Sequence, residues 1–204
     1  MRAIVIVLAL AAGCAGSVPA TRFYDLAPAR SGPVTTTRTA PVLAIEPFDT
    51  DQGYDDDRIV YRTNPYRFDY YEYHRWNASP GVLVGKFLAR ALARTGAFSQ
   101  IVRTPVGDGG VVLSGRVIAI EEVDRSDGPW QGHIVLDLRL ADGTTGEVLW
   151  SQQFDETAAM PVRSPEGVAR AISTALDRVA REIATPVREI ADERAAAARA
   201  QASR

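Results

Sequence analysis

Apolar and polar residues alternate along the middle of the chain, which predicts a meander of β-strands. Over residues 130–141 every second residue is apolar, a period of two that is typical of a strand with one buried face. The segment Asp142–Gly146 has the composition of a tight turn between two such strands. The predicted strands span residues 21–26, 42–48, 58–62, 67–73, 100–103, 111–123, 130–141 and 147–155.

Two other segments repeat apolar residues every three or four positions, which predicts amphipathic helices. Both begin with a serine that can cap free amides and a proline that suits the first helical position, at Ser79-Pro80 and Ser164-Pro165. Gly96 suits the end of the first helix, and Pro186 is expected to end or kink the second. The tail over residues 188–204 is rich in alanine and arginine, so we expect a frayed or disordered helix there.

The order of these elements favours one α+β domain over residues 21–187. A mostly antiparallel sheet would carry the two main helices on one face, as a two-layer sandwich. The chain has a single cysteine, so no disulfide within the chain can hold this domain together.

The first 14 residues have the composition of an export signal. Arg2 is followed by a short apolar run and then by Gly13 and Cys14, and this run is shorter than the roughly 20 residues that span a bilayer. The sequence Ala11-Ala12-Gly13-Cys14 is similar to a bacterial lipobox, although leucine is usual at the place of Ala11. This predicts removal of residues 1–13, lipidation of Cys14 and a leash over residues 14–20. The alternative is an ordinary secretory signal that leaves a free thiol.

Composition excludes several classes of function. The net charge of −2 does not suit a nucleic-acid-binding protein. With two histidines and one cysteine, and without G-x-S-x-G, P-loop or G-x-G-x-x-G motifs, the sequence nominates no catalytic residue, metal site or cofactor. The aspartates over residues 49–57 lack the order of a calcium-binding loop and are interpreted as a solvated acidic loop.

Aromatic residues are concentrated between residues 54 and 76, over the two strands predicted at 58–62 and 67–73. They either pack on the core or form a surface for a partner or ligand, since tyrosine and tryptophan are enriched at interfaces. Strict alternation would place Tyr71 and Tyr73 on one face and Phe68 and Tyr70 on the other. The candidate partner-binding residues are Tyr61, Arg62, Tyr66, Tyr70, Tyr71, Tyr73 and Trp76.

The motifs follow one another in a recognisable order: the lipobox, FYDLAP, VLAIEPF, DRIVYR, YEYHRW, the first helix, LSGRVIAIEEV and GEVLWSQQF. This order resembles the ABC-type transport auxiliary lipoproteins, from about Cys14 to Val187. That family contains paraquat-inducible protein C and the lipoprotein partners of Mce-type (mammalian cell entry) lipid transporters. Ile59–Arg62 and Tyr73–Trp76 match its characteristic segments, and Ala15 in place of aspartate is similar to the sorting signal of outer-membrane lipoproteins.

The resemblance implies a protein that is not an enzyme, anchored at the periplasmic face of the outer membrane. Its implied partners are an Mce-type periplasmic protein with its ABC permease and ATPase, and its implied cargo is phospholipid or another hydrophobic molecule. A homo-oligomer is compatible with this role. Two alternatives stay open: a structural or assembly lipoprotein of the outer membrane, and a lipid carrier with a cavity of roughly 300–1,000 Å³ between helices and sheet.

Overall fold

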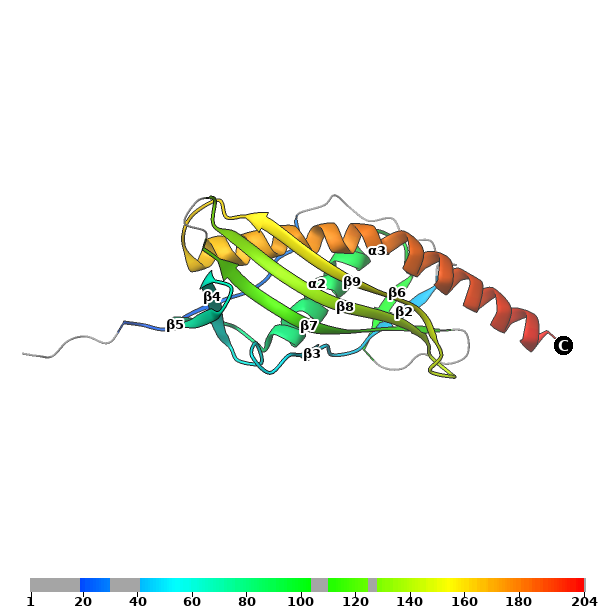
Figure 1. Cartoon of the computed structure of the whole chain (residues 1–204). Helices are drawn as coiled ribbons and strands as arrows, with labels where there is room; N and C mark the ends of the chain where they lie inside the picture. The colour runs from blue at the N-terminus through cyan, green and yellow to red at the C-terminus, as the bar shows by residue number, and fades with distance from the viewer. Residues whose placement is uncertain (1–18, 30–40, 104–109, 125–127, 204) are drawn as a thin grey trace, which may run out of the picture.

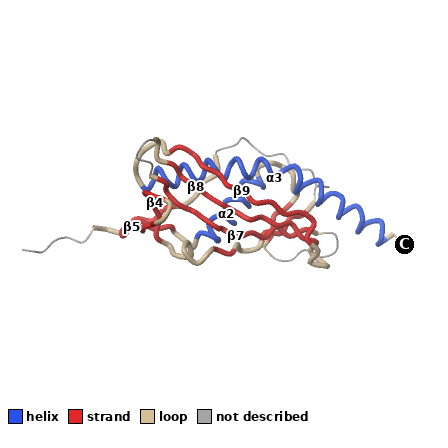
Figure 2. The backbone as a smooth tube through the Cα atoms, in the orientation of Figure 1, coloured by secondary structure: helices blue, strands red, loops and turns tan. Residues whose placement is uncertain are grey.

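A computed structural model describes residues 19–29, 41–103, 110–124 and 128–203. In these ranges a nine-stranded sheet forms one layer and two helices form the other (Figures 1 and 2). The predicted leader and lipidation site, in residues 1–18, lie outside the described residues. The elements are β1 (Arg22–Tyr24), β2 (Val42–Ile45), β3 (Asp49–Thr50), β4 (Arg58–Asn64), β5 (Arg67–Trp76), α2 (Pro80–Ala93), β6 (Gln100–Val102), β7 (Val111–Val123), β8 (Gln131–Asp142), β9 (Val148–Ala159) and α3 (Pro165–Ala202).

The long strand β7 organises the sheet. Along one side it pairs with β8 in antiparallel fashion, and β8 pairs in the same way with β9. Along its other side three short strands pair parallel to it in turn, beginning at Val111 for β2, Arg116 for β3 and Glu121 for β4. The parallel pairings involve two or three residues each, whereas the long pairings are antiparallel. The predicted α+β class with a mostly antiparallel sheet is therefore confirmed.

Both helices cover the same face of the sheet, as predicted. Strand β8 turns Ile134, Leu136 and Leu138 into the core, and their neighbours in sequence face the opposite, more exposed side. Glycine at position 132 allows α3 to lie close to β8, because a Cβ there would be 2.8 Å from the Cβ of Ala171. The core joins side chains from the sheet to Leu83, Val84, Phe87 and Leu88 of α2 and to Val168, Ile172, Leu176, Val179 and Ile183 of α3.

Helix α3 differs from its prediction in length. It continues through Pro186 to Ala202, and it changes direction partway along its length in Figure 1, as expected for a helix with an internal proline. Beyond the proline, Ala191 is buried and the Arg194 guanidinium lies 2.5 Å from the carboxylate of Asp142. The tail thus has a packed side that its composition did not predict, because small alanines fit against the sheet and a long arginine reaches the β8–β9 turn.

Candidate functional site

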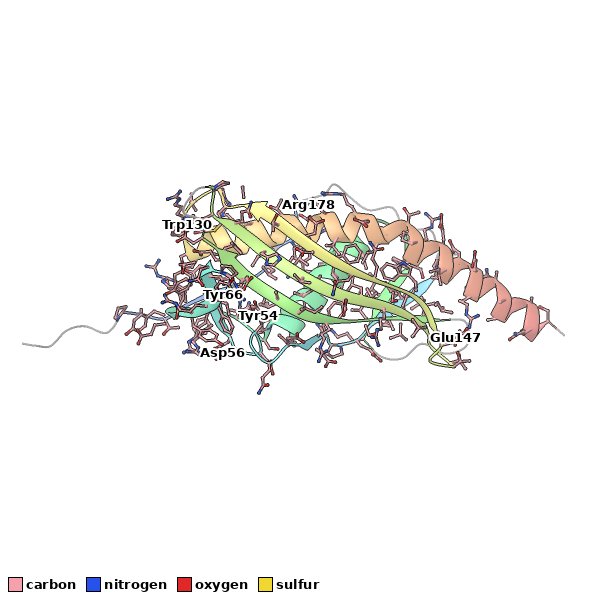
Figure 3. The ribbon with its side chains drawn as sticks, viewed as in Figure 1. Tyr54, Asp56, Tyr66, Trp130, Glu147 and Arg178 are labelled. Atoms are coloured by element: carbon pink, nitrogen blue, oxygen red, sulfur yellow. The ribbon has the colours of Figure 1, made fainter. Side chains whose placement is uncertain are left out.

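The aromatic residues lie on β4, β5 and the loop over residues 51–57, at one end of the sheet (Figure 3). The two strands pair antiparallel, but their register shifts: Arg58 faces Arg75, whereas Val60 faces Tyr70. Strand β5 therefore contains a bulge of extra residues, which interrupts simple alternation. The residues of β5 before the bulge, including Phe68 and Tyr70, keep the alternation that the sequence predicts.

One side of β5 packs on the loop over residues 51–57. The ring of Phe68 stacks on Tyr54 with 5.9 Å between centroids, and the Tyr70 hydroxyl donates a 3.1 Å hydrogen bond to the carbonyl oxygen of Gly53. The guanidinium of Arg58 lies 4.1 Å from the centroid of the Tyr70 ring. These contacts make Phe68 and Tyr70 half-buried supports of the hairpin.

The other side of β5 faces the helices. Tyr71 contacts the ring of Tyr61 at a centroid distance of 5.0 Å, and its hydroxyl donates to Glu122 at 3.0 Å. Trp76, at the end of the strand, is only 1% exposed and belongs to the core. Tyr73 is half-buried, whereas Tyr66 in the hairpin turn is 96% exposed.

The structure therefore divides the seven candidate residues. Trp76 is a core residue and presents no surface to a partner, and Tyr66 is fully available. The remaining five are half-buried and are divided between the two sides of the hairpin; we call their exposed edges the hairpin surface: Tyr61, Arg62, Tyr70, Tyr71 and Tyr73. Because the Tyr71 hydroxyl has a buried acceptor, truncating Tyr71 is expected to affect stability as well as any partner.

A buried carboxylate, Glu121, ties the hairpin to the sheet. Its Oε2 accepts a 2.5 Å hydrogen bond from the Tyr54 hydroxyl and a 3.0 Å bond from Nε of Arg62. Its Oε1 lies 3.1 Å from Nδ1 of His133, whose Nε2 lies 3.0 Å from Oδ1 of Asp155. We call these five side chains the Glu121 network, and they join the loop, β4, β7, β8 and β9.

The Glu121 network shifts the titration of its members. Burial opposes the charge on Glu121, but hydrogen bonds from His133, Tyr54 and Arg62 outweigh it and lower the pKa of this carboxyl. The hydrogen bond to Glu121 raises the pKa of His133 against the effect of burial, with help from Asp155. Burial and the neighbouring carboxylate raise the pKa of Tyr54 to about 12. The Glu121 carboxylate therefore stays ionised, and its hydrogen bonds hold the loop and the strands of the Glu121 network together.

The next residue, Glu122, is in a different environment. It is 1% exposed, and among the described contacts both of its oxygens accept from the hydroxyl of Tyr71 while no cation pairs with it. Burial raises the pKa of Glu122, and the nearby charge of Asp124 adds to the effect. Two consecutive glutamates thus lie on opposite faces of β7 with opposite pKa shifts.

Ion pairs hold two aspartates of the acidic loop, whereas the sequence predicted that this loop is simply solvated. Asp56 pairs with Arg58 at 2.8 Å, and the hydrogen bond from Arg58 lowers the pKa of Asp56 to about 2. Asp57 pairs with Arg75 at 2.5 Å, on the other strand of the hairpin. Across the described ranges, no three acidic, histidine or cysteine side chains are grouped to hold a metal ion. These aspartates hold the hairpin through arginines.

Sequence reasoning missed Glu121, Glu122 and His133. A signal was present, because two consecutive acidic residues end an otherwise apolar strand in VIAIEEV. Carboxylates in such a strand are buried only when they are paired or hydrogen-bonded. The partners, however, come from four other elements, and only the folded chain brings them together.

An apolar groove of about 130 Å³ lies beside α2, at the edge formed by β2 and β6. Ile45, Pro47, Val82 and Ile101 line it, and Lys86 lies at its side. This volume is below the roughly 300–1,000 Å³ of sites that enclose a drug-sized ligand. A wider, open groove separates the N-terminal segment around Phe23 from α3.

The described part of the molecule thus presents aromatic edges that are supported by a buried network of charged side chains. Its helices include none that is long and apolar enough to cross a membrane. The chain belongs to the family of ABC-type transport auxiliary lipoprotein components, whose model matches residues 24–184. No curated protein sequence matches it.

Solved structures agree with this assignment at the level of the fold. Protein XCC0632 from Xanthomonas campestris, of the family DUF330, is 18% identical and superimposes with a TM-score of 0.71, covering 85% of this chain and 98% of that one. An uncharacterized protein is 14% identical with a TM-score of 0.66, covering 83% of this chain and 99% of that one. The predicted family is confirmed.

Proposed function

We propose that the chain is a lipid-anchored auxiliary component of an Mce-type ABC transport system, which moves phospholipids or other hydrophobic molecules between the inner and outer membranes. Family membership over residues 24–184 carries the proposal. Cys14 supplies the anchor, because several acyl chains on one cysteine give durable attachment where a single chain does not. Ala15 supports sorting to the periplasmic face of the outer membrane.

In this proposal the protein docks or bridges the Mce-type periplasmic protein, which works with its permease and ATPase. The hairpin surface is the proposed docking surface, and Tyr61 and Tyr73 belong to it. Tyrosine suits such a surface because it buries a large area while keeping a polar hydroxyl. The Glu121 network and the arginine pairs hold this surface in one shape, which lowers the entropy lost on binding.

In this proposal the domain positions the Mce-type protein, and that partner transports the cargo. The groove beside α2 has about 130 Å³, and the groove between the segment around Phe23 and α3 has about 680 Å³ but is open to solvent, so neither encloses a whole phospholipid. Arginines of the hairpin are held in ion pairs, among them Arg62 with Glu121 and Arg75 with Asp57. Both observations favour a docking role over a carrier or an enzyme.

The test is a pull-down of the intact lipoprotein from mildly solubilised envelopes, with mass spectrometry of the proteins that accompany it. Recovery of an Mce-type protein with its permease and ATPase is the expected result. Recovery of outer-membrane assembly or cell-wall proteins alone would refute the transport role and favour the structural alternative.

The surface is tested by Tyr73→Ala in the same experiment. We expect less of the Mce-type protein to be recovered at an unchanged melting temperature, because Tyr73 is only half-buried and belongs to the hairpin surface. Val148→Ala is the matched control, since Val148 is an exposed apolar residue at the β8–β9 turn, away from the hairpin. Equal recovery with both variants would remove the hairpin from the interface.

A further inference from the structure

The directions of the strands show where the chain enters the domain. Strand β1 runs parallel to β5, so the residues before Arg22 lie toward the end of the sheet where β5 begins. Strand β5 begins at Arg67, directly after the hairpin turn that carries Tyr66. In Figure 1 the blue start of the described chain, from residue 19, lies at the end where β4 and β5 lie.

The register of the sheet brings the loop between β9 and α3 to the same end. Arg62 near the end of β4 pairs with Val123 at the end of β7. Val123 pairs with Gln131 at the start of β8, and Gln131 pairs with Ala159 at the end of β9. The residues that follow β9, including Val162, therefore lie at this end of the sheet. Figure 3 labels Trp130 and Tyr66 at the same end.

Exposed apolar side chains are concentrated there. Of the four large apolar residues that are strongly exposed in the described ranges, Tyr66 at 96% and Val162 at 52% lie at this end, and Phe23 at 62% lies beside Arg75, on the segment that leads toward it. Phe23 and Pro161 line the same open groove, which places Phe23 beside the loop that carries Val162. The fourth, Val148, lies at the opposite end, next to the β8–β9 turn.

We propose that this end of the domain rests on the surface of a phospholipid bilayer, with Phe23, Tyr66 and Val162 in the interfacial layer. The inference rests on the anchor at Cys14 in the proposed function. A chain spans at most about 3.3–3.6 Å per residue, so the eight steps from Cys14 to Arg22 hold this end within about 29 Å of the membrane. The apolar end is therefore the part of the domain that the anchor keeps nearest to lipid.

The chemistry of the surface suits that occupant. Aromatic residues such as Phe23 and Tyr66 are favoured at the level of lipid headgroups, since an apolar ring and a polar tip match both sides of the boundary. Arg22 and Arg163 are exposed at the same end, where guanidinium groups can meet lipid phosphates. The Arg163 guanidinium already lies 5.1 Å from the centroid of the Trp130 ring, which keeps it on this surface.

This arrangement sets the orientation of the molecule. Helix α3 begins at the same end and has 38 residues, so at a rise of about 1.5 Å per residue it extends up to roughly 57 Å from the membrane. The β8–β9 turn and the C-terminal part of α3 then project into the periplasm. The sides of the hairpin stay accessible to a partner that approaches along the membrane.

The experiment places a fluorescent probe at single positions of the full-length lipoprotein in vesicles of phosphatidylethanolamine and phosphatidylglycerol. Acylation consumes the only natural cysteine, so Phe23→Cys, Tyr66→Cys and Val162→Cys each provide one thiol for an environment-sensitive dye. Val148→Cys is the matched control. We expect brominated lipids to quench the dye at positions 23, 66 and 162 and to leave it bright at position 148.

Equal quenching at positions 66 and 148 would overturn the inference and leave the transport role intact, because no partner takes part in this assay. Labelling of the unsubstituted protein would instead reveal a free Cys14 thiol, and the anchor and this inference would fail together. Far-UV circular dichroism of each labelled variant confirms that the comparison is made between folded proteins. Exposed positions were chosen for the probes so that the fold is not disturbed.

Discussion

Substituting the consecutive glutamates one at a time, Glu121→Gln and Glu122→Gln, is expected to change stability in opposite directions at neutral pH. Both side chains are buried, and glutamine has nearly the same shape as glutamate. The difference lies in their partners: Glu121 accepts from Arg62, Tyr54 and His133, whereas the one donor to Glu122 within the described residues is the hydroxyl of Tyr71. The two variants therefore compare a buried carboxylate that is paired with an arginine, Glu121, with one that accepts from a neutral hydroxyl, Glu122.

The loss for Glu121→Gln follows from its hydrogen bonds. A bond to a charged group contributes about 1.5–3 kcal/mol, and breaking a fully buried ion pair costs about 3–5 kcal/mol. The side chain of Arg62 is 23% exposed, so water recovers part of this loss. We expect destabilisation of about 2–4 kcal/mol, against a total of about 5–15 kcal/mol for a typical domain. The variant stays folded, and its urea midpoint falls by about 1–2 M for a slope of about 2 kcal/mol/M.

The gain for Glu122→Gln has a defined dependence on pH. Burial raises the pKa of Glu122 in the folded state above its unfolded value of 4.5, so its ionisation opposes folding once the pH rises above that value. Glutamine keeps the acceptor for Tyr71 and removes this charge. We therefore expect Glu122→Gln to stabilise the protein above the folded pKa and to have little effect below pH 4.

Urea unfolding of the full chain at pH 7.5 and at pH 4 measures both effects. Glu189→Gln is the matched control, because Glu189 is exposed on α3 and such changes stay within about ±0.5 kcal/mol. Comparable destabilisation by Glu121→Gln and Glu122→Gln at pH 7.5 would refute the distinction between the two sites. A gain for Glu122→Gln that persists at pH 4 would show that charge is not its cause.

Three further predictions concern single positions. Folding raises the pKa of His133, so the stability that its protonated ring contributes is complete below the unfolded pKa and is lost as the pH rises through the folded pKa. Urea unfolding of His133→Gln at several pH values should not show this loss. Gly132→Val should destabilise by about 1–3 kcal/mol in thermal unfolding, since the added Cβ would lie 2.8 Å from that of Ala171. Arg194→Ala removes the pair with Asp142 and should speed hydrogen exchange beyond residue 187; unchanged exchange would mean that alanine packing alone holds the tail.

Periodicity in the sequence was enough to predict the strands of the meander and the starts of both helices. Alternation over residues 130–141 appears in the structure as β8 with one buried face, and each Ser-Pro pair begins a helix. These features depend on neighbours within a few residues. The family also followed from the order of short motifs, because its pattern extends over most of the chain.

Long-range pairing was decided by the tertiary structure alone. The bulge in β5 moves its aromatic residues off the alternating pattern, and Trp76 becomes a core residue because β1 and α2 close over that end of the strand. The short strand β3 forms because β7 offers it a free edge, although Asp49 and Thr50 have no strand pattern of their own.

The sequence by itself determined the class of fold, the family and the candidate anchor, because these depend on local periodicity and on motifs that are close in the chain. The tertiary structure decided which acidic residues are compensated, since the partners of Glu121 are 12 to 67 residues away in sequence. It also decided that the N-terminal strand runs parallel to β5, so that the chain before it leads toward the hairpin turn. Burial and charge compensation depend on distances in space, and a linear pattern does not contain those distances.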